Sequence, residues 1–378
     1  MISSGRYADV VVIGGGQAGL AAGFYLRRHG VDFAILDAQT SPGGAWQHVW
    51  ESLRLFSPAQ FSSLPGWQMP IPEHGGYPDT AHVIDYLTRY EQRYQLPIRR
   101  GVTVTSVHRT EGGFRLDTSD GGWTARIVVS ATGTWWQPFI PALARNSRFT
   151  GAQLHTVHYG KPQDFAGMRV AVVGAGNSGA QIAADLAGHA AQVRWMTHMT
   201  PRFLPDDVDG RVLFQLANQR YRALKAGLPA PAGISELGDV VAVPPVRDAR
   251  DAGRLHVMPM FTRLAPDGTQ WSDGSSWPAD AIIWATGFRP ALHHLAPLHL
   301  QRVDGHPVTD GTAYRHDPRL HLLGYGDWTG PAAATLIGVG PIARDMAAQV
   351  KDLLASQGVS PVTSGLQPIP GYRLTVGS

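Results

Sequence analysis

The chain has 378 residues, of which 43% are hydrophobic and 16% charged, and its formal net charge is only +3. That length suits two or three domains, and that composition is typical of a globular protein with a sizeable core. The arginines are scattered, which argues against nucleic acid as a partner, and the absence of cysteine excludes disulfides, thiolate metal sites and dithiol redox relays.

The N-terminal unit begins with an apolar strand, a glycine turn and a helix, and then enters a long irregular segment. So long a segment inside a compact protein is usually functional. Short strands near the end of the unit predict a meander around a tight Ser-Asp-Gly-Gly turn. The predicted elements are, in order, a strand at 10–13, the turn at 14–19, a helix at 17–29, a strand at 32–38, the Trp- and Pro-rich segment at 41–78, a helix at about 80–95 and the meander at 102–129.

A second unit repeats this plan. Its predicted elements are a strand at 169–173, a glycine turn at 174–179, a helix that reaches about 188 and a strand at 192–197. The segment "SDGGWTARIVVSATG" at 119–133 is also matched by "SDGSSWPADAIIWATG" at 272–287. Two units of like length and order predict an α/β fold with two Rossmann-like dinucleotide-binding domains.

Each unit carries the spacing Gly-x-Gly-x-x-Gly between an apolar strand and an Ala-rich helix. In this motif the first glycine makes the tight turn, the second lets the backbone approach a pyrophosphate, and the third lets the helix pack on the strand. The pyrophosphate then lies at the helix N-terminus, where free N–H groups favour an anion. A glycine turn without a ligand is the alternative, and two copies in the same context argue against it. The glycines are Gly14, Gly16 and Gly19 in the first unit and Gly174, Gly176 and Gly179 in the second.

The residues that follow the two turns differ in charge. Asp37 lies 21 positions after Gly16, about where a carboxylate binds the ribose hydroxyls of a dinucleotide. The same offset in the second unit gives Thr197, and residues 193–202 contain no Asp or Glu that would repel a 2′-phosphate. His198 and Arg202 could supply positive charge there, or be ordinary surface residues. We therefore expect the second site to accept NADPH as well as NADH.

The C-terminal stretch 320–355 predicts a strand, a Gly-Asp turn and a long helix, because its apolar residues recur at helical spacing. Asp327 precedes this helix, where an N-cap or an anion is favoured. His155 and His158 have no third ligand nearby in the sequence, so no metal site is predicted despite the 16 histidines.

The two glycine turns, the two Ala-Thr-Gly strand ends and the late Gly-Asp together resemble the flavoproteins that bind two dinucleotides. "FTGAQLHTVHY" at 149–159 matches FxGxxxHxxxY, the fingerprint of class B flavin-containing monooxygenases, and "GGAW" at 43–46 resembles their Gly-Gly-x-Trp beside the flavin. The related Baeyer–Villiger enzymes usually have Trp where this chain has Tyr159. The chain looks most like the short bacterial flavin-containing monooxygenases, some of which accept either nicotinamide cofactor.

The resemblance implies a glutathione-reductase-like arrangement, with an FAD-binding domain at 1–164 and 290–378 and an NAD(P)H-binding domain inserted at 165–289. It implies that NADPH or NADH reduces FAD, and that a C4a-peroxyflavin then oxygenates a sulfide, an amine or a ketone. FAD would be held by Gly14, Gly16, Gly19 and Asp37, and toward its riboflavin end by Gly44, Trp46, Thr132 and Asp327. NAD(P)H would be held by Gly174, Gly176, Ser178 and Gly179, with Thr197 and His198 near its ribose.

One departure from the family concerns catalysis. Where the family often has an Asn after the Gly-Gly-x-Trp loop, placed to hydrogen-bond at the flavin, this chain has Phe56 followed by Ser57. An apolar wall excludes water but offers no hydrogen bond, so we expect an oxygenase that releases some hydrogen peroxide. An uncoupled NAD(P)H oxidase or flavin reductase and a non-catalytic redox sensor are the alternatives, whereas a dithiol reductase is excluded because the chain has no cysteine.

The expected partners are a small-molecule substrate and O2, with no nucleic acid and no membrane, and a homodimer is left open. No stretch approaches the ~18 uncharged apolar residues of a membrane span. The first residues lack the charged region and apolar core of a signal peptide. We therefore expect a cytoplasmic protein.

Overall fold

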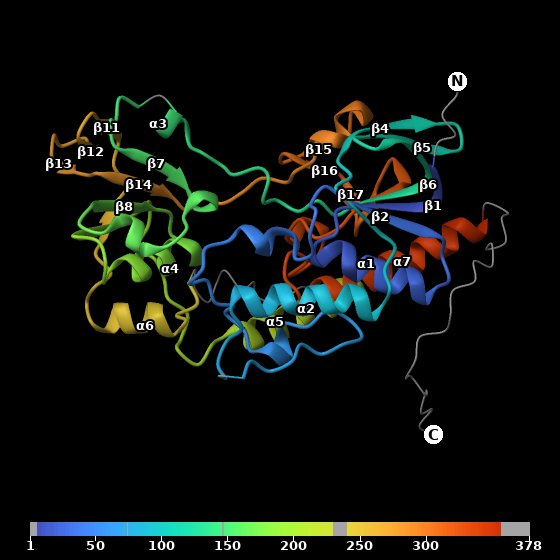
Figure 1. The fold of residues 1–378 in the computed structure, drawn as a ribbon, viewed down its shortest axis with the longest axis horizontal. Coiled ribbons are helices and arrows are strands. Elements are labelled where there is room, and N and C mark those ends of the chain that lie inside the picture. The colour runs from blue at the N-terminus through green and yellow to red at the C-terminus, as the bar shows by residue number, and fades with distance from the viewer. Residues whose placement is uncertain (1–5, 74, 146, 230–239, 357–378) are drawn as a thin grey trace.

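The computed structural model describes residues 6–73, 75–145, 147–229 and 240–356 in two lobes (Figure 1). The helices are α1 (Gln17–Arg28), α2 (Thr80–Arg93), α3 (Ala142–Arg145), α4 (Asn177–Leu186), α5 (Gly210–Lys225), α6 (Pro244–Asp251) and α7 (Val339–Ser356). The strands of the first lobe are β1 (Arg6–Ile13), β2 (Phe33–Asp37), β3 (Ile98–Arg100), β4 (Val104–Thr110), β5 (Gly113–Thr118), β6 (Gly121–Ser130), β15 (Arg302–Val303), β16 (His306–Pro307), β17 (Thr309–Asp310), β18 (Ala313–Tyr314) and β19 (Asp317–Leu322). Those of the second lobe are β7 (Ala152–His155), β8 (Arg169–Val173), β9 (Gln192–Thr197), β10 (Val257–Pro259), β11 (Arg263–Ala265), β12 (Gly268–Gln270), β13 (Ser276–Pro278) and β14 (Ala281–Trp284).

The first lobe is built on a sheet whose main path runs β17-β18-β19-β6-β1-β2-β3, with β4 and β5 paired beside β6. Strands β3, β2, β1, β6 and β19 are parallel neighbours. Alternate residues of β1 face opposite sides: Val10 and Val12 pack with α1, α2 and α7, whereas Val11 and Ile13 pack with the meander. Because both faces are covered, β2 is buried along its whole length, as expected for a parallel strand.

The second lobe repeats the arrangement with a smaller parallel sheet, ordered β10-β9-β8-β14-β7. Helices α4 and α6 lie on one face, where Trp195 is fully buried. The three-stranded sheet β11–β13 lies on the other face, where Trp284 is buried at 1% exposure. Two sheets whose central strands are parallel, each packed with helices, confirm the predicted fold class and both strand–turn–helix openings.

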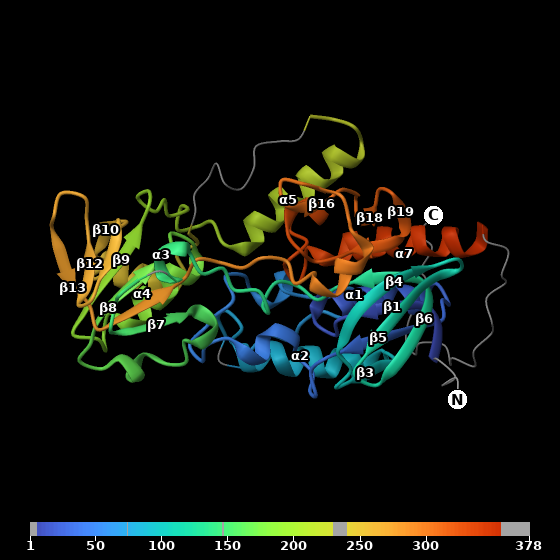
Figure 2. The same ribbon diagram turned by 90° about the horizontal axis from the view of Figure 1, so that it is seen from above.

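Two elements bear on the predicted domain division at residues 165 and 289, which itself stays a prediction. Strand β7 precedes residue 165, yet it pairs with β14 of the second sheet. Helix α5 lies between 165 and 289, yet it reaches the first lobe (Figure 2), where the Tyr221 hydroxyl donates to Asp345 of α7 at 2.5 Å. The inserted segment therefore also contacts the first lobe far from residues 165 and 289, where it begins and ends.

The predicted position of Asp327 at the start of the last helix is wrong. Helix α7 begins only at Val339, because residues 331–338 form successive turns, including Ala332 at a positive φ of 58°. Asp327 instead opens a short 3-10 turn, and its Oδ1 accepts a hydrogen bond from the Ala332 N–H at 3.2 Å.

Two crossings of the chain connect the lobes and pair with each other. The N–H of Phe139 donates to the Gly287 carbonyl at 2.9 Å, and the N–H of Arg289 donates to the Gln137 carbonyl at 2.8 Å. A further bond, from the Ala291 N–H to the Gly133 carbonyl, measures 2.9 Å. None of the described helices is both long enough and apolar enough to cross a bilayer.

Candidate active site

The first glycine turn has two glycines that the fold needs and one that leaves space. Gly14 has a φ of +105°, and a Cβ there would lie 2.6 Å from the Ala131 carbonyl oxygen. A Cβ on Gly19 would overlap the Gly14 carbonyl oxygen. Gly16 differs, since its Cβ would meet only Gly44 Cα at 3.8 Å. Gly16 therefore leaves the room that a pyrophosphate needs at the N-terminus of α1.

The second glycine turn reproduces this geometry. Gly174 has a φ of +132°, and a Cβ there would overlap the carbonyl oxygen of Ala285. Ala131 and Ala285 occupy corresponding places in the two Ala-Thr-Gly segments, so the same backbone carbonyl lies beside each turn. The Trp195 indole N–H also donates to the Gly174 carbonyl at 2.6 Å. A Cβ on Gly176 would meet nothing within 4 Å.

A cavity of about 780 Å³ follows the carboxyl ends of β1, β2 and β6 and reaches the second lobe. In an α/β sheet this edge is where ligands bind. The first lobe contributes the glycine turn, Asp37 and the segment around Trp46, and the second contributes Ser178 of α4. Its volume lies within the roughly 300–1,000 Å³ range of small-molecule and cofactor sites. A dinucleotide with its pyrophosphate at Gly16 fits this cavity, since Gly14, Gly15 and Gly16 carry no Cβ.

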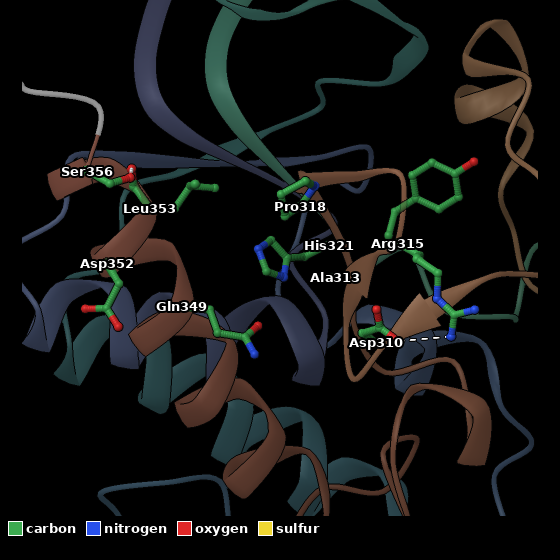
Figure 3. A pocket seen from close by; sticks show the side chains of 10 residues that line it. Asp310, Ala313, Arg315, Pro318, His321, Gln349, Asp352, Leu353 and Ser356 are labelled. Carbon is green, nitrogen blue, oxygen red and sulfur yellow. Dashed lines mark hydrogen bonds and ion pairs between the residues drawn. The ribbon is translucent and has the colours of Figure 1, made fainter.

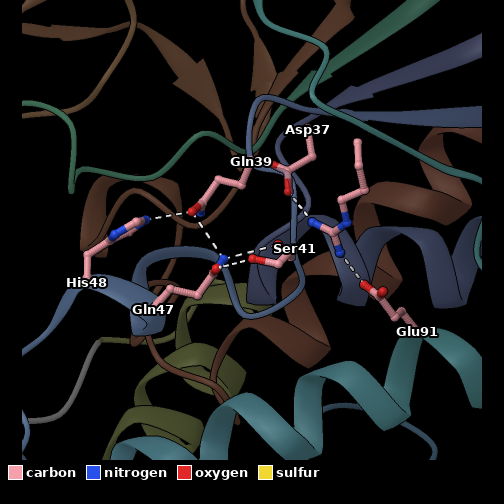
Figure 4. Close-up of polar contacts among 7 residues, drawn as sticks. Asp37, Gln39, Ser41, Gln47, His48 and Glu91 are labelled. Atoms are coloured by element: carbon pink, nitrogen blue, oxygen red, sulfur yellow. Dashed lines mark hydrogen bonds and ion pairs between the residues drawn. The ribbon is translucent and has the colours of Figure 1, made fainter.

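Asp37 ends β2 at one end of this cavity and is part of a charged chain (Figure 4). The guanidinium of Arg100 binds Asp37 Oδ2 through Nη1 and Glu91 Oε2 through Nη2. All three side chains are largely buried: Asp37 is 7% exposed, Arg100 19% and Glu91 16%. Burial raises the pKa of Glu91, and the neighbouring Arg100 guanidinium offsets only part of that rise.

A polar network closes the loop beside Asp37 (Figure 4). Gln39 Oε1 accepts from Gln47 Nε2 at 3.1 Å and lies 2.6 Å from His48 Nε2. Gln47 also donates to the Ser41 carbonyl at 3.1 Å and accepts from the Ser41 hydroxyl. Since Gln39, Gln47 and His48 line the cavity, this network shapes its polar mouth.

Gln17 connects three segments around the cavity. It is the first residue of α1, and its Oε1 accepts a hydrogen bond from the Trp46 indole N–H at 3.0 Å. Its Nε2 donates to the Ala334 carbonyl at 2.7 Å. The glycine turn, the Gly-Gly-x-Trp segment and the turns before α7 are thereby held together.

Thr132 belongs to a polar cluster with Ser130, His294 and Tyr325. Its Oγ1 donates to the Ala291 carbonyl at 2.7 Å and lies 2.7 Å from the Tyr325 hydroxyl. Ser130 Oγ lies 3.0 Å from His294 Nε2, which burial keeps neutral by lowering the pKa of His294 to about 3. The cluster fixes the backbone where the first crossing leaves β6.

Aromatic rings form a continuous wall between the lobes. Trp135 stacks on Phe288 with ring centroids 5.3 Å apart, and His48 also stacks on Trp135, with centroids 6.3 Å apart. The ring of His155, from the fingerprint, meets the edge of Phe288 at 5.0 Å. Because Trp135, Phe288 and His48 line the cavity, this wall offers an apolar and aromatic surface where the two units meet.

The structure brings together part of the predicted site. The predicted residues that line the cavity are Gly14, Gly16, Asp37, Gly44, Trp46, Thr132 and Ser178. Gly19 and Gly179 act in packing, while Gly174 and Gly176 form the second turn outside the cavity lining. Thr197 is buried at 3% exposure at the end of β9, and His198 beside it is exposed. The ligand contacts proposed for these residues stay predictions.

Phe56 and Ser57 are not among the residues that line the cavity. The Phe56 ring packs against the core of the second lobe, and its carbonyl accepts from the Gly210 N–H at 2.7 Å. The Ser57 hydroxyl lies 2.8 Å from that of Ser62. Asp327 does not line the cavity either, whereas Gly324 does. The catalytic part assigned to Phe56 and Ser57 also stays a prediction.

Sequence reasoning missed Arg100, Glu91, Gln17 and the aromatic pair Trp135–Trp136. The Trp pair offered a signal, because it follows the first Ala-Thr-Gly after one intervening residue, Thr134. Arg100 offered none, since its closeness to Asp37 depends on β3 pairing in parallel beside β2.

A second cavity, of about 500 Å³, lies between the β18–β19 hairpin and α7 (Figure 3). His321 is 1% exposed in its wall, with Nδ1 3.0 Å from the Thr312 hydroxyl. Its Nε2 has no hydrogen-bond partner within the described residues. Burial lowers the pKa of His321 to about 4, so the ring is neutral at neutral pH. No residue that lines this cavity also lines the dinucleotide cavity.

Comparison with known proteins shows the family of the chain. A family model described as pyridine nucleotide-disulphide oxidoreductase matches residues 11–221. The flavin-containing monooxygenase from Stenotrophomonas maltophilia is 48% identical, with a TM-score of 0.83 over 92% of this chain and 99% of that one. An uncharacterized oxidoreductase CzcO-like of Geobacillus kaustophilus is 34% identical over 282 residues, which are 74% of this chain and 80% of that protein.

A structure of OTEMO in complex with FAD and NADP shares the fold, with a TM-score of 0.67 over 94% of this chain and 86% of that one, at 16% identity. The two glycine turns, the shared cavity and these matches agree on one type of enzyme. The chain therefore belongs to the pyridine nucleotide-disulphide oxidoreductase family, and within it to the bacterial class B flavin-containing monooxygenases, which use FAD and NADPH.

Proposed function

We propose that this monooxygenase transfers one oxygen atom of O2 to soft nucleophiles such as sulfides and amines, and that it also oxidises ketones in the Baeyer–Villiger manner. The observation that carries the proposal is the single cavity that reaches from the first glycine turn to Ser178 of the second lobe. FAD, when bound, supplies the link between hydride from NADPH and O2. The protein supplies orientation and the exclusion of water.

The lining of the cavity supports a small, largely apolar substrate. Trp46, Trp50, Leu53 and Phe288 line it, and among the residues that the structure describes Asp37 is the one acidic residue in the lining. We propose that Asp37 itself binds the ribose of FAD, so its charge is taken up by the cofactor. A neutral or weakly basic sulfide, amine or ketone therefore enters without a charged group opposite it, while the aromatic wall excludes water from the reacting atoms.

We also propose that NADH serves as an electron donor beside NADPH. Thr197 stands where a carboxylate would enforce NADH, and no acidic residue occurs in 193–202. His198 is exposed next to it and offers one polar group to a 2′-phosphate. A charge-assisted hydrogen bond contributes about 1.5–3 kcal/mol, or one to two decades in affinity. We expect the preference for NADPH to fall within about that range.

The test supplies the purified enzyme with FAD, a methyl aryl sulfide or a cyclic ketone, and either NADPH or NADH under 18O2. We expect one labelled oxygen in the sulfoxide or lactone, a slower but measurable reaction with NADH, and some hydrogen peroxide. Oxidation of NADPH with peroxide as the sole product, across sulfides, amines and ketones, would contradict the substrate proposal. A preference above a thousandfold for either donor would contradict the proposal on NADH.

A further inference from the structure

We infer that Arg100 is a positioning residue for FAD: it holds the Asp37 carboxylate in the orientation that receives the ribose hydroxyls of the adenosine. The inference rests on the proposed contact between Asp37 and that ribose. Arg100 and Glu91 do not line the cavity, so they act on the cofactor only through Asp37.

The topology of the sheet places Arg100 against Asp37. Strands β2 and β3 are parallel, and Asp37 is the direct Cα partner of Arg100. Partners in register carry their side chains on the same face of a sheet. Two backbone bonds continue this pairing past the strand ends, from the Val102 N–H to the Asp37 carbonyl at 2.9 Å and from the Gly101 N–H to the Gln39 carbonyl at 3.0 Å.

The guanidinium leaves Asp37 free to bind a ligand. Arg100 Nη1 donates to Oδ2, and among the described residues no hydrogen bond reaches Oδ1. A carboxylate offers about four acceptor positions on its two oxygens, so Oδ1 and the second lone pair of Oδ2 remain for two hydroxyl donors. Asp37 also packs on the glycine turn, since a Cβ on Gly15 would lie 2.9 Å from Asp37 Oδ2.

Glu91 fixes Arg100 from the other side. Its Oε2 accepts from Nη2, so the planar guanidinium is anchored at both nitrogens (Figure 4). Arg100 also stands between two carboxylates that would otherwise repel each other across a half-buried space. Glu91 belongs to α2, the helix that packs on the Gly-Gly-x-Trp segment. The same helix therefore supports both Asp37, through Arg100, and the Gly-Gly-x-Trp segment of the cavity.

The test measures the Kd of FAD for the apoproteins of Arg100→Met, Asp37→Asn and the double variant, with Arg99→Met as the control. Arg99 is the neighbour of Arg100 on β3, but it is exposed and faces away from Asp37. Loss of a hydrogen bond to a charged group predicts a Kd raised about tenfold or more in Arg100→Met. We expect Arg99→Met to keep the Kd of the parent. Arg100→Lys keeps the charge but cannot bind both carboxylates in the same way, so we expect it to restore part of the affinity that Arg100→Met loses.

The double variant separates positioning from a general structural effect. If Arg100 acts through Asp37, adding Arg100→Met to Asp37→Asn leaves the Kd nearly where Asp37→Asn alone puts it, whereas additive losses overturn the inference. The inference is also overturned if Asp37→Asn binds FAD more weakly than the parent while Arg100→Met has an unchanged or lower Kd. An unchanged Kd in Asp37→Asn instead refutes the ribose contact itself. Should Arg100→Met fail to fold, Glu91→Gln carries the test, with a several-fold rise in Kd that disappears in the Asp37→Asn background.

Discussion

At the scale of single residues, the two glycine turns separate positions that serve the fold from positions that serve the ligand. The third glycine of each turn lies against the carbonyl of the first, so a side chain there has nowhere to go. The middle glycine lies against almost nothing in the protein. The same motif therefore contains two different physical reasons for glycine, and substitution by alanine distinguishes them.

We expect Gly176→Ala to keep its stability and lose affinity for NADPH, because its methyl group meets no protein atom within 4 Å but occupies the approach of the pyrophosphate. A steric cost of about 1.4 kcal/mol already raises the KM for NADPH tenfold. Gly179→Ala is the matched variant, and it should unfold more easily by about 1–3 kcal/mol because its Cβ overlaps the Gly174 carbonyl. Melting curves and steady-state kinetics check both, and equal melting temperatures would contradict the assignment.

Phe56 poses a different question at the same scale, because its ring packs on the second core instead of lining the cavity. We expect Phe56→Asn to destabilise the protein by about 1–3 kcal/mol through lost packing, and to leave the ratio of hydrogen peroxide to NADPH unchanged. Ser57→Ala serves as the control for the neighbouring side chain. A peroxide yield that falls clearly in Phe56→Asn would instead support the role predicted from the sequence.

At the scale of elements, α5 belongs to the inserted segment but contacts the first lobe. It begins at Gly210, where the Phe56 carbonyl accepts its N–H, and it ends where Tyr221 and Lys225 both donate to Asp345 of α7. Burial acts to raise the pKa of Asp345, but the hydrogen bonds from Lys225, Tyr221 and Arg344 outweigh it and hold the pKa below its usual range. A charged Asp345 therefore contributes to holding α5 against α7, beside the packing of Tyr221 on the first core.

We expect Asp345→Asn to loosen α5, with amide exchange across 210–225 about 5–30-fold faster, which corresponds to about 1–2 kcal/mol. A lowered folded pKa gives stability that is present above the unfolded value near 4 and is lost as the pH falls through the folded value. The protection of α5 should thus be constant at neutral pH and decline below about pH 4 in the parent. Asp352→Asn, at an exposed position of the same helix, should leave the exchange unchanged, and equal exchange in both variants would refute the contact.

At the scale of the whole molecule, two sheets with parallel central strands are joined by two paired chain segments. The hydrogen bonds between Phe139 and Gly287 and between Arg289 and Gln137 make these segments a narrow ribbon and not two independent linkers. The cavity passes beside this ribbon, and the aromatic wall of Trp135 and Phe288 is built on it. The ribbon therefore links the two lobes at the place where the cavity reaches from one to the other.

The sequence by itself determined the strand–turn–helix openings, the repeated architecture and the placement of Asp37 at the end of β2. These features depend on glycine sterics and on apolar runs within about 30 residues, so patterns in the local sequence predict them. Only the tertiary structure decided that Arg100 lies against Asp37, that β7 joins the second sheet, that α5 contacts α7 and that Phe56 faces the second core. Each of these depends on which segments far apart in the chain become neighbours and in which register, and no local periodicity encodes that choice.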